Sequence, residues 1–468
     1  MAMLELQGRK VLVLGLGDSG LSMARWLSRH GARVSVADTR AVPPHADQLK
    51  RELPEVRLEC GEFSDASVGG AELIAISPGV DRRAPAVAAA LRRGVPVAGD
   101  IELFARGLAQ LIPHPSSLIP PKILGITGTN GKSTVTRMAG DICTAAGIAT
   151  RVAGNIGTPA LEVLSAIENG GPVPGAVVLE LSSFQLESTA NLAADAATLL
   201  NLSPDHLDRY DSIADYAAAK ARVFNGSGAQ VLNRGDACSA ALRLPGRAVY
   251  RFGLDAPGAD DDWGLVERGR RTWLAHGERA LMAADELRVT GTHNAANALA
   301  AGALCHAIGV AAAPIVAALR AFRGLPHRVE HVAAINGITF YDDSKGTNVG
   351  STVAALSGFA RPVVLIAGGD GKGQDFGPLR APVARHARAV ILIGRDRELI
   401  AAALAGCGVP LERAADMDQA VQTALALGRD GDAVLLSPAC ASFDMFSNYV
   451  HRGEVFAAAV RAAARRRT

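Results

Sequence analysis

The stretch that most constrains the fold of this chain is residues 123–140, ILGITGTNGKSTVTRMAG. An apolar strand-like run, a turn with glycines and a helix-forming segment follow one another without a gap. In α/β proteins this order places a glycine-rich loop and a helix N-terminus around a bound phosphate group. The stretch therefore predicts a parallel sheet with helices between its strands and a phosphate-binding loop at one strand end.

The residues of this loop suit a nucleotide triphosphate. Gly128 and Gly131 allow the backbone to bend so that its N–H groups point at phosphate oxygens. Lys132 adds a positive charge for the β- and γ-phosphates, and Ser133 or Thr134 can bind Mg²⁺. We therefore predict that ATP binds through seven consecutive residues, namely Gly128, Thr129, Asn130, Gly131, Lys132, Ser133 and Thr134.

The loop departs from the strict phosphate-loop pattern G-x-x-x-x-G-K-[ST], because Ile126 stands where the first glycine should be. The alternative interpretation is an ordinary strand-to-helix turn with a surface lysine. We favour the phosphate loop, since the strand, the glycines, the Lys-Ser-Thr run and the helix all keep their register.

Strand-like and helix-like segments alternate along the whole sequence. Residues 111–122 hold four prolines and two serines, which is typical of a linker, and a second boundary is expected near Gly324–His327. The alternation predicts three consecutive α/β domains. They are a Rossmann-like N-terminal domain at 1–110, a central P-loop domain at 111–324 that begins with the linker 111–122, and a Rossmann-like C-terminal domain at 325–468.

Composition argues against several classes of protein. The 468-residue chain has a net charge of +2, which is too balanced to indicate nucleic-acid binding. No apolar run approaches the ~20 residues of a membrane helix, and the N-terminal sequence runs into a strand instead of a cleavable leader. The six cysteines form no CxxC pair for zinc. We expect a monomeric, cytoplasmic protein without membrane insertion or a nucleic-acid partner.

A second glycine motif, GLGDSG at Gly15–Gly20, also follows a strand and opens a helix, and Asp38 ends the next strand. Taken alone, it indicates a dinucleotide site with Asp38 on a ribose hydroxyl. The motif itself indicates only that a phosphate group binds at a helix N-terminus. A nucleotide diphosphate of another kind would fit it equally well. A tight turn that binds nothing is the third interpretation.

Three polar residues lie further along the central segment. Glu180 ends the strand in VVLELSSFQLE, His206 in NLSPDHLDRY follows the next strand, and Lys220 lies on a helix in DYAAAKARVF. Ligands bind at the C-terminal strand ends of an open parallel sheet, so Glu180 and His206 are expected beside the phosphate loop. A carboxylate there suits Mg²⁺. A single helix lysine such as Lys220 is most often a surface residue.

Further motifs occur in a fixed order after the phosphate loop. They are ELSSFQLE, DHLDRY, GTHNAANALAA, LPHRVE, DDSKGTNVGST, GGDGKGQDF and SPACASFDMFSNYVHRG. The ordered series resembles the Mur ligases, the ATP-dependent enzymes that build the peptidoglycan precursor, and the resemblance covers the whole chain. The last four motifs, with GLGDSG and ADTR, look most like the family member that adds glutamate to UDP-N-acetylmuramoyl-L-alanine.

The resemblance implies roles for residues of the first two domains. The GLGDSG motif becomes a cradle for the UDP end of the substrate, where the contacts would be Asp18, Ser19, Asp38, Thr39 and Arg40. Asn155 in AGNIG would contact the muramoyl-alanine portion. The implied Mg²⁺ ligands are Ser133, Glu180, His206 and Lys220 as its carbamate. A carbamate offers oxygens to Mg²⁺, whereas an ammonium repels it.

The resemblance also implies contacts around the nucleotide and the amino acid. The further ATP contacts would be Asn294, Asn297, Arg328 and Asp343, and the glutamate contacts would be Lys345, Thr347, Lys372, Ser442, Phe443 and Tyr449. Without the resemblance, an asparagine pair on an alanine-rich helix is more often a solvated face. The run GGDGKGQDF is then a flexible glycine turn.

The implied reaction uses ATP to join a carboxylate to an amine through an acyl phosphate, with Lys132, His206 and Lys220 as catalytic residues. Lys132 and Mg²⁺ would stabilise the negative charge. His206 is a candidate for accepting the amine proton, although a metal-binding histidine is poorly suited to that task. The residues alone do not distinguish D- from L-glutamate, and the resemblance implies the D form.

Three rival functions compete with this one. A folylpolyglutamate synthase is also an ATP-dependent glutamate ligase, but it lacks an N-terminal UDP-type domain like the first ~110 residues here. A nicotinamide-dependent dehydrogenase built on GLGDSG leaves the phosphate loop unexplained. A nucleotide-controlled binding switch would release phosphate without making an amide.

Overall fold

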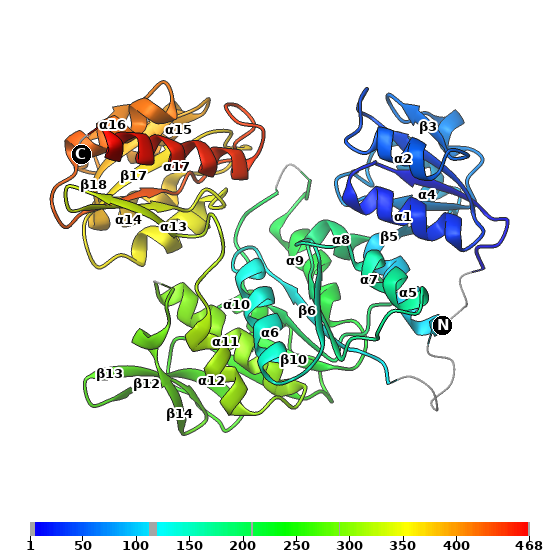
Figure 1. The fold of residues 1–468 in the computed structure, drawn as a ribbon, viewed down its shortest axis with the longest axis horizontal. Coiled ribbons are helices and arrows are strands. Elements are labelled where there is room, and N and C mark those ends of the chain that lie inside the picture. The colour runs from blue at the N-terminus through cyan, green and yellow to red at the C-terminus, as the bar shows by residue number, and fades with distance from the viewer. Residues whose placement is uncertain (1–4, 112–118, 207–208, 290, 467–468) are drawn as a thin grey trace.

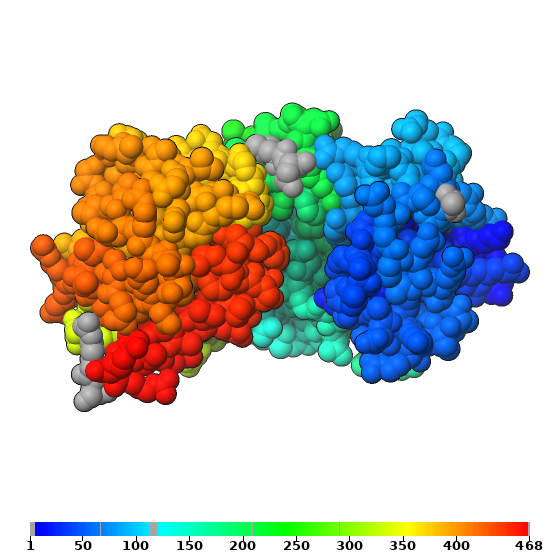
Figure 2. All heavy atoms as spheres, turned by 90° about the horizontal axis from the view of Figure 1, so that it is seen from above, coloured from blue at the N-terminus to red at the C-terminus, as the bar shows by residue number. Residues whose placement is uncertain are grey.

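The computed structural model describes residues 5–111, 119–206, 209–289 and 291–466. Three sheets, each covered by helices, form three lobes in chain order, and the first and third lobes lie on opposite sides of the middle one (Figures 1 and 2). This confirms the predicted series of α/β units. Most of the linker, residues 112–118, lies outside the described residues, and the domain boundaries stay a prediction.

The first lobe is a five-stranded parallel sheet in the order β3-β2-β1-β4-β5. Strand β1 is at its centre, with four consecutive buried residues, as expected of a strand covered on both faces. Its elements are β1 (Lys10–Leu14), α1 (Asp18–Arg29), β2 (Arg33–Asp38), α2 (Ala46–Glu52), β3 (Arg57–Cys60), α3 (Asp65–Val68), β4 (Leu73–Ile76), α4 (Pro85–Arg92), β5 (Val97–Gly99) and α5 (Asp100–Leu111).

The middle lobe has a nine-stranded sheet in the order β14-β13-β12-β11-β10-β9-β6-β8-β7. Strand β6 leads into the glycine loop and helix α6. The elements are β6 (Lys122–Thr127), α6 (Lys132–Ala145), β7 (Thr150–Gly154), α7 (Ala160–Glu168), β8 (Ala176–Glu180), α8 (Ser183–Glu187), β9 (Ala196–Leu199), α9 (Ile213–Ala221), β10 (Ala229–Asn233), α10 (Ala237–Ala241), β11 (Val249–Phe252), β12 (Asp262–Arg268), β13 (Arg271–His276), β14 (Arg279–Ala283), α11 (Thr292–Ala307) and α12 (Ala312–Ala321).

The expected strand–helix alternation fails at one edge of this sheet. Strands β12, β13 and β14 form an antiparallel meander. Only Gly277 and Glu278 separate β13 from β14, and Gly277 has a φ of 53°. Two residues can close a hairpin but cannot carry a crossover helix, so these strands must run antiparallel.

The third lobe has a six-stranded sheet in the order β15-β16-β20-β17-β18-β19. Its first pair, β15 and β16, is antiparallel, because Asn336 and Gly337 form a two-residue turn with positive φ values of 50° and 75°. The elements are β15 (Glu330–Ile335), β16 (Ile338–Asp342), α13 (Val349–Ser357), β17 (Val363–Gly368), α14 (Arg380–His386), β18 (Ala387–Ile393), α15 (Arg397–Leu404), β19 (Leu411–Arg413), α16 (Met417–Leu427), β20 (Ala433–Leu436) and α17 (Tyr449–Arg465).

The first two lobes share one hydrophobic core. Trp26 on α1, Phe104 on α5 and Leu164 on α7 belong to the same cluster of buried side chains, and α5 and α7 lie side by side in Figure 1. The core of the third lobe is built from its own residues alone. Among the described helices, none has the length and apolar character needed to cross a membrane.

Candidate active site

Three of the predicted binding regions lie at the C-terminal ends of parallel strands, where α/β sheets bind ligands. In the first lobe a pocket of about 610 Å³ opens beyond β1, β2 and β4. All five predicted UDP contacts of this lobe line it, and so does Asn155 from the middle lobe; the five are Asp18, Ser19, Asp38, Thr39 and Arg40. The structure therefore brings this predicted set together.

The carboxylate of Asp38 is already engaged within the first lobe. It accepts hydrogen bonds from the Leu16 backbone N–H at 2.6 Å and from the Arg40 guanidinium at 2.6 and 2.8 Å. A ribose hydroxyl of a nicotinamide nucleotide would have to displace Arg40. This geometry disfavours the dehydrogenase alternative and leaves Arg40 as the cationic group at the pocket.

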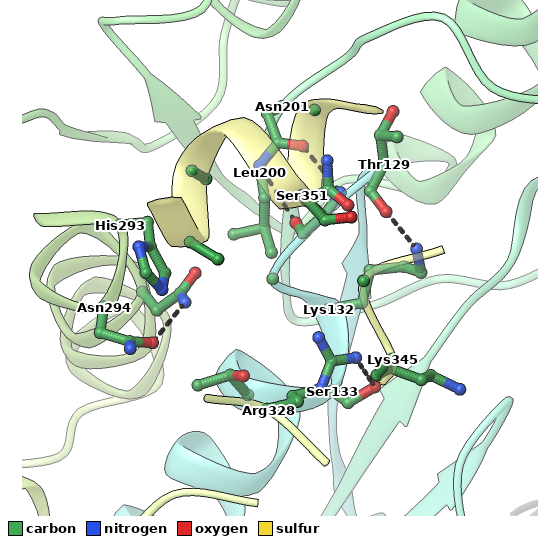
Figure 3. Close-up of a pocket in the computed structure, with 18 of the residues that line it drawn as sticks. Thr129, Lys132, Ser133, Leu200, Asn201, His293, Asn294, Arg328, Lys345 and Ser351 are labelled. Carbon is green, nitrogen blue, oxygen red and sulfur yellow. Dashed lines mark hydrogen bonds between the residues drawn. The ribbon is translucent and has the colours of Figure 1, made fainter. Parts of the chain in front are cut away.

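A second pocket, of about 520 Å³, surrounds the phosphate loop in the middle lobe (Figure 3). Gly128 and Gly131 have positive φ values of 152° and 86°, as the loop prediction requires. A Cβ at Gly128 would lie 3.0 Å from the Leu200 Cβ and one at Gly131 would lie 2.5 Å from the Asn297 Oδ1, so neither position has room for a side chain.

One detail of the loop differs from the prediction. The backbone N–H groups of Thr129 and Asn130 do not point at the pocket, because they donate to the carbonyl and side-chain oxygens of Asn201 at 2.9 and 2.8 Å. The N–H groups of the first turn of α6 remain as phosphate donors, since a helix start leaves its first N–H groups without helical partners. Asn201 was missed in the sequence, although it follows a strand end as Glu180 does.

Lys132 lies at the start of α6 with its ammonium folded onto the loop. Its Nζ donates to the carbonyl oxygens of Gly128 and Thr129, both at 2.8 Å (Figure 3). Burial lowers the pKa of this ammonium, and the nearby Glu180 carboxylate opposes that effect. The Lys132 side chain is only partly exposed, and its ammonium contacts the phosphate loop, which disfavours the surface-lysine alternative.

The predicted nucleotide contacts from other elements reach the same pocket. Asn294 and Asn297 on α11 share one helix face, with the Asn297 Nδ2 donating to the Asn294 Oδ1 at 3.2 Å. Both are nearly buried and line the pocket, so this face is not the solvated one of the alternative interpretation. Arg328 crosses from the third lobe and donates to the Ser133 Oγ at 2.9 Å (Figure 3).

Two further third-lobe residues with shifted pKa values line this pocket. Burial raises the pKa of the Asp343 carboxyl to about 7, and the Ser437 hydroxyl that donates to it at 2.7 Å acts in the opposite direction. Burial, reinforced by the charge of Arg328, lowers the pKa of the Lys345 ammonium to about 8. Both residues therefore lie in a poorly solvated, positively charged part of the pocket.

Glu180 has the features of a cation ligand. Its side chain is buried, and its Oε1 accepts from the Asn155 Nδ2 at 2.8 Å. Its Oε2 is buried without a hydrogen-bond partner among the described residues. Such an oxygen is costly unless a cation or donor meets it, and oxygen is the ligand atom that Mg²⁺ prefers. His206 lines the same pocket, and burial lowers the pKa of its imidazole, which favours the neutral form.

Lys220 is not a surface residue. It is 1% exposed, its Nζ donates to the Gly128 carbonyl oxygen at 2.8 Å, and the ammonium lies 4.6 Å from the centre of the Tyr216 ring. Burial, with repulsion from Lys132, places its pKa well below the ordinary value. A lysine in this setting is neutral in a larger fraction of molecules than a surface lysine.

The predicted glutamate residues are only partly brought together. Lys345 and Thr347 line the phosphate-loop pocket, whereas Lys372, Ser442, Phe443 and Tyr449 lie outside it. Lys372 and Ser442 follow β17 and β20, the adjacent strands at the switch point of the third sheet. The Tyr449 ring lies 3.7 Å from the Lys345 Nζ. The Phe443 side chain is 74% exposed.

Comparisons with known proteins match all three lobes. Residues 9–99 match the model described as Mur ligase MurD-like, N-terminal domain. Residues 126–305 match the Mur ligase middle domain, and residues 327–440 match the Mur ligase, glutamate ligase domain. The chain belongs to the Mur ligase family. It is therefore a ligase, and the resemblance carried by the ordered motifs is confirmed.

Two curated Mur ligase relatives match nearly the whole chain. Those from Nitrosospira multiformis and Methylobacillus flagellatus are each 56% identical and span 98% of this chain, and 96% and 98% of their own length. Both are named UDP-N-acetylmuramoylalanine--D-glutamate ligase.

Solved structures show the same Mur ligase fold at low identity. UDP-N-acetylmuramate-alanine ligase MurC from Thermotoga maritima is 17% identical, with a TM-score of 0.60 over 97% of this chain and 99% of its own. FolC from E. coli, solved with DHPP and ADP, is also 17% identical, with a TM-score of 0.55 over 79% of this chain and 93% of its own.

Proposed function

We propose that this chain uses ATP to join D-glutamate to UDP-N-acetylmuramoyl-L-alanine, through an acyl phosphate, in peptidoglycan precursor synthesis. The observation that carries the proposal is the position of Asn155, which lines both the first-lobe pocket and the phosphate-loop pocket. A substrate with its UDP end in the first pocket can therefore extend past Asn155 to the nucleotide. The names of the 56%-identical relatives support this substrate and this amino acid.

The first step is attack of the alanine carboxylate oxygen on the γ-phosphorus of ATP. The bond between the γ-phosphorus and the bridging oxygen breaks, ADP leaves, and an acyl phosphate forms. Lys132, Arg328 and the N-terminal turn of α6 surround the place where this negative charge gathers. Preorganised donors and cations of this kind stabilise the transition state of phosphoryl transfer.

In the second step the neutral glutamate amine attacks the acyl carbon, its nitrogen loses one proton, and inorganic phosphate leaves with its bonding electron pair and can take up that proton. Lys345 and Thr347 line the pocket from the third lobe, on the side from which the amino acid would arrive. We propose that the third lobe closes over the pocket during this step, bringing Lys372 and Ser442 closer to the nucleotide. Closure would also exclude water from the acyl phosphate.

We propose that Mg²⁺ is held by Glu180, His206, the Ser133 hydroxyl and carbamylated Lys220. The unpartnered Oε2 of Glu180 supports this set. Mg²⁺, when bound, would neutralise charge on the phosphates. For the carbamate, the neutral Lys220 nitrogen attacks the carbon of CO₂ and loses one proton; the lowered pKa favours this reaction.

Both pockets are formed by one chain, so we also propose that the monomer is active. A cytoplasmic location is proposed because the reaction depends on ATP.

The test is a phosphate-release assay with ATP, UDP-N-acetylmuramoyl-L-alanine and either D- or L-glutamate, together with detection of the amide product. We expect phosphate and product in equal amounts with the D form only. Product with a folate substrate would instead favour a folylpolyglutamate synthase, and phosphate release without an amide would favour a nucleotide switch. The Lys132→Ala variant should make no product, and near-normal turnover by it would contradict the ATP assignment.

A further inference from the structure

Helix α13 belongs to the third lobe, but its N-terminus packs on the phosphate loop of the middle lobe. Its N-cap residue, Asn348, is only 5% exposed. The Asn348 Nδ2 donates to the Asn130 Oδ1 and to the Asp205 Oδ2, both at 3.2 Å. The Asn130 Nδ2 donates back to the Asn348 Oδ1 at 3.4 Å. One side chain thus joins the phosphate loop, the segment before His206 and the third lobe.

The backbone makes the same approach within the first turn of the helix. A Cβ built on Gly350 would lie 3.2 Å from the Ser203 Oγ and 3.3 Å from the Asn130 Nδ2, closer than nine in ten real Cβ contacts. A side chain at this position would therefore require the Ser203 or Asn130 side chain to shift by a few tenths of an ångström. Figure 3 shows this helix, with Ser351 labelled, close beside the phosphate loop.

The helix N-terminus is joined in turn to the glycine loop at 369–373, which carries Lys372. The Gln374 Oε1 accepts from the Val349 backbone N–H at 3.1 Å. The Gln374 Nε2 donates to the Gly371 carbonyl oxygen at 3.0 Å and to the Ala439 carbonyl oxygen at 3.4 Å. Hydrogen bonds, joined through the peptide link between Asn348 and Val349, therefore connect the phosphate loop to Gln374 and to the loop that carries Lys372.

We propose that Asn348 and Gln374 are positioning residues that couple nucleotide binding at the phosphate loop to amino-acid binding at Lys372. The inference rests on the proposed function, because it takes the Lys372 loop as the glutamate site. A nucleotide that moves Asn130 moves the N-terminus of α13, and Gln374 passes that movement to the glycine loop. Coupling between two sites is reciprocal, so glutamate must change nucleotide affinity by the same factor.

The Asn348→Ser variant separates coupling from helix capping. Serine is as good an N-cap residue as asparagine, so it keeps the hydrogen bond to the Ser351 N–H that the Asn348 Oδ1 accepts at 2.8 Å. It lacks the amide donors to Asn130 and Asp205. Asn348→Ala loses both the cap and the contacts between lobes. Methionine is similar in size to glutamine, so Gln374→Met removes only the hydrogen bonds that join the N-terminus of α13 to the loop that carries Lys372.

The experiment measures the Kd of a non-hydrolysable ATP analogue with and without D-glutamate, and KM and kcat for each substrate. In the wild-type protein we expect D-glutamate to tighten analogue binding by about tenfold, within the usual range of coupling between sites. Asn348→Ser and Gln374→Met should reduce this factor to about one and raise the KM for D-glutamate by about tenfold. The midpoint of thermal unfolding of Asn348→Ser should stay at the wild-type value.

A matched control is Asp416→Ser, which exchanges another N-cap residue of the third lobe, on α16. It should leave the coupling factor and the KM for D-glutamate unchanged. Wild-type coupling in Asn348→Ser, or a coupling factor of one in the wild-type protein, would overturn the inference. If the wild-type protein made no amide with D-glutamate, the proposed function itself would fail, so the two failures are distinguishable.

Discussion

Among single residues, Lys220 gives the sharpest chemical test. Its Nζ lies against the carbonyl oxygen of Gly128, under the phosphate loop. Lys220→Ala should reduce turnover by about 10²-fold or more, the loss typical of removing one preorganised electrostatic group. Formate, acetate or propionate should restore part of the activity, because a free carboxylate can occupy the position of the carbamate oxygens. Product formation is measured over a series of acid concentrations.

Lys132→Ala is the matched control for this rescue. Lys132 is proposed to act as an ammonium on phosphate, so a carboxylate cannot replace it. The same acids should leave Lys132→Ala inactive. Equal rescue of both variants, or rescue of neither, would count against a carbamate at Lys220.

The ionisation of Asp343, in the phosphate-loop pocket, should affect the stability of the folded protein. Burial raises the pKa of its carboxyl from 3.8 to about 7. The folded protein therefore binds this proton more tightly than the unfolded chain, and the stabilisation is complete below pH about 4 and lost as pH rises to about 7. At about 1.4 kcal/mol per pKa unit, the upper bound of the effect is about 4 kcal/mol.

Asp343→Asn should remove this pH dependence, since an amide does not ionise and its oxygen can still accept from Ser437. We expect the variant to gain stability relative to the wild-type protein between pH 5 and pH 8. Thermal unfolding at several pH values measures the difference. Asp47→Asn on the exposed helix α2 is the control, and a difference that is constant with pH in Asp343→Asn would contradict the raised pKa.

At the scale of elements, helix α11 is positioned by a glycine. A Cβ on Gly302 would lie 2.6 Å from the Trp263 Cζ3, so β12 packs directly on the helix backbone. Alanine is a better helix former than glycine by about 1 kcal/mol, whereas overpacking costs typically 1–3 kcal/mol. We expect the clash to prevail, so that Gly302→Ala lowers stability and, because α11 carries Asn294 and Asn297, raises the KM for ATP.

A double variant tests whether the clash is the cause. Trp263→Leu removes the ring, and in that background Gly302→Ala should be neutral or stabilising. Urea unfolding of the four proteins gives the interaction free energy of the pair. Additive effects in this cycle would show that Trp263 does not set the position of α11.

The elements also show which features the sequence could predict. Strand–glycine–helix order placed the phosphate loop, and the strand-end rule placed Glu180 in its pocket, because both depend on local sequence. The hairpin at Asn336 and Gly337 was also predictable, because Asn-Gly is a favoured two-residue hairpin turn. The burial of Lys220 and the contact between Asn130 and Asn348 depend on how distant segments pack, since Lys220 and Gly128 are 92 positions apart in the sequence. No local pattern encodes such contacts.

At the scale of the whole molecule, the three lobes are joined unequally. The first and middle lobes share a hydrophobic core around Trp26, which is fully buried and donates through Nε1 to the Glu168 Oε1 of α7 at 3.1 Å. The third lobe meets the middle lobe through polar groups such as Arg328 and Asn348. The shared core should make the first two lobes one cooperative unit, while the third lobe unfolds separately.

Calorimetry of two variants tests this division. Trp26→Ala should cost about 3–5 kcal/mol, as large buried aromatic residues do, and lower the transition of the joint first and middle lobes. The transition of the third lobe should not move. Phe456→Ala, in the fully buried core of the third lobe, should have the opposite pattern. A separate wild-type transition for residues 5–111 would contradict the joint unit, because a lobe that unfolds alone cannot depend on a core shared with its neighbour.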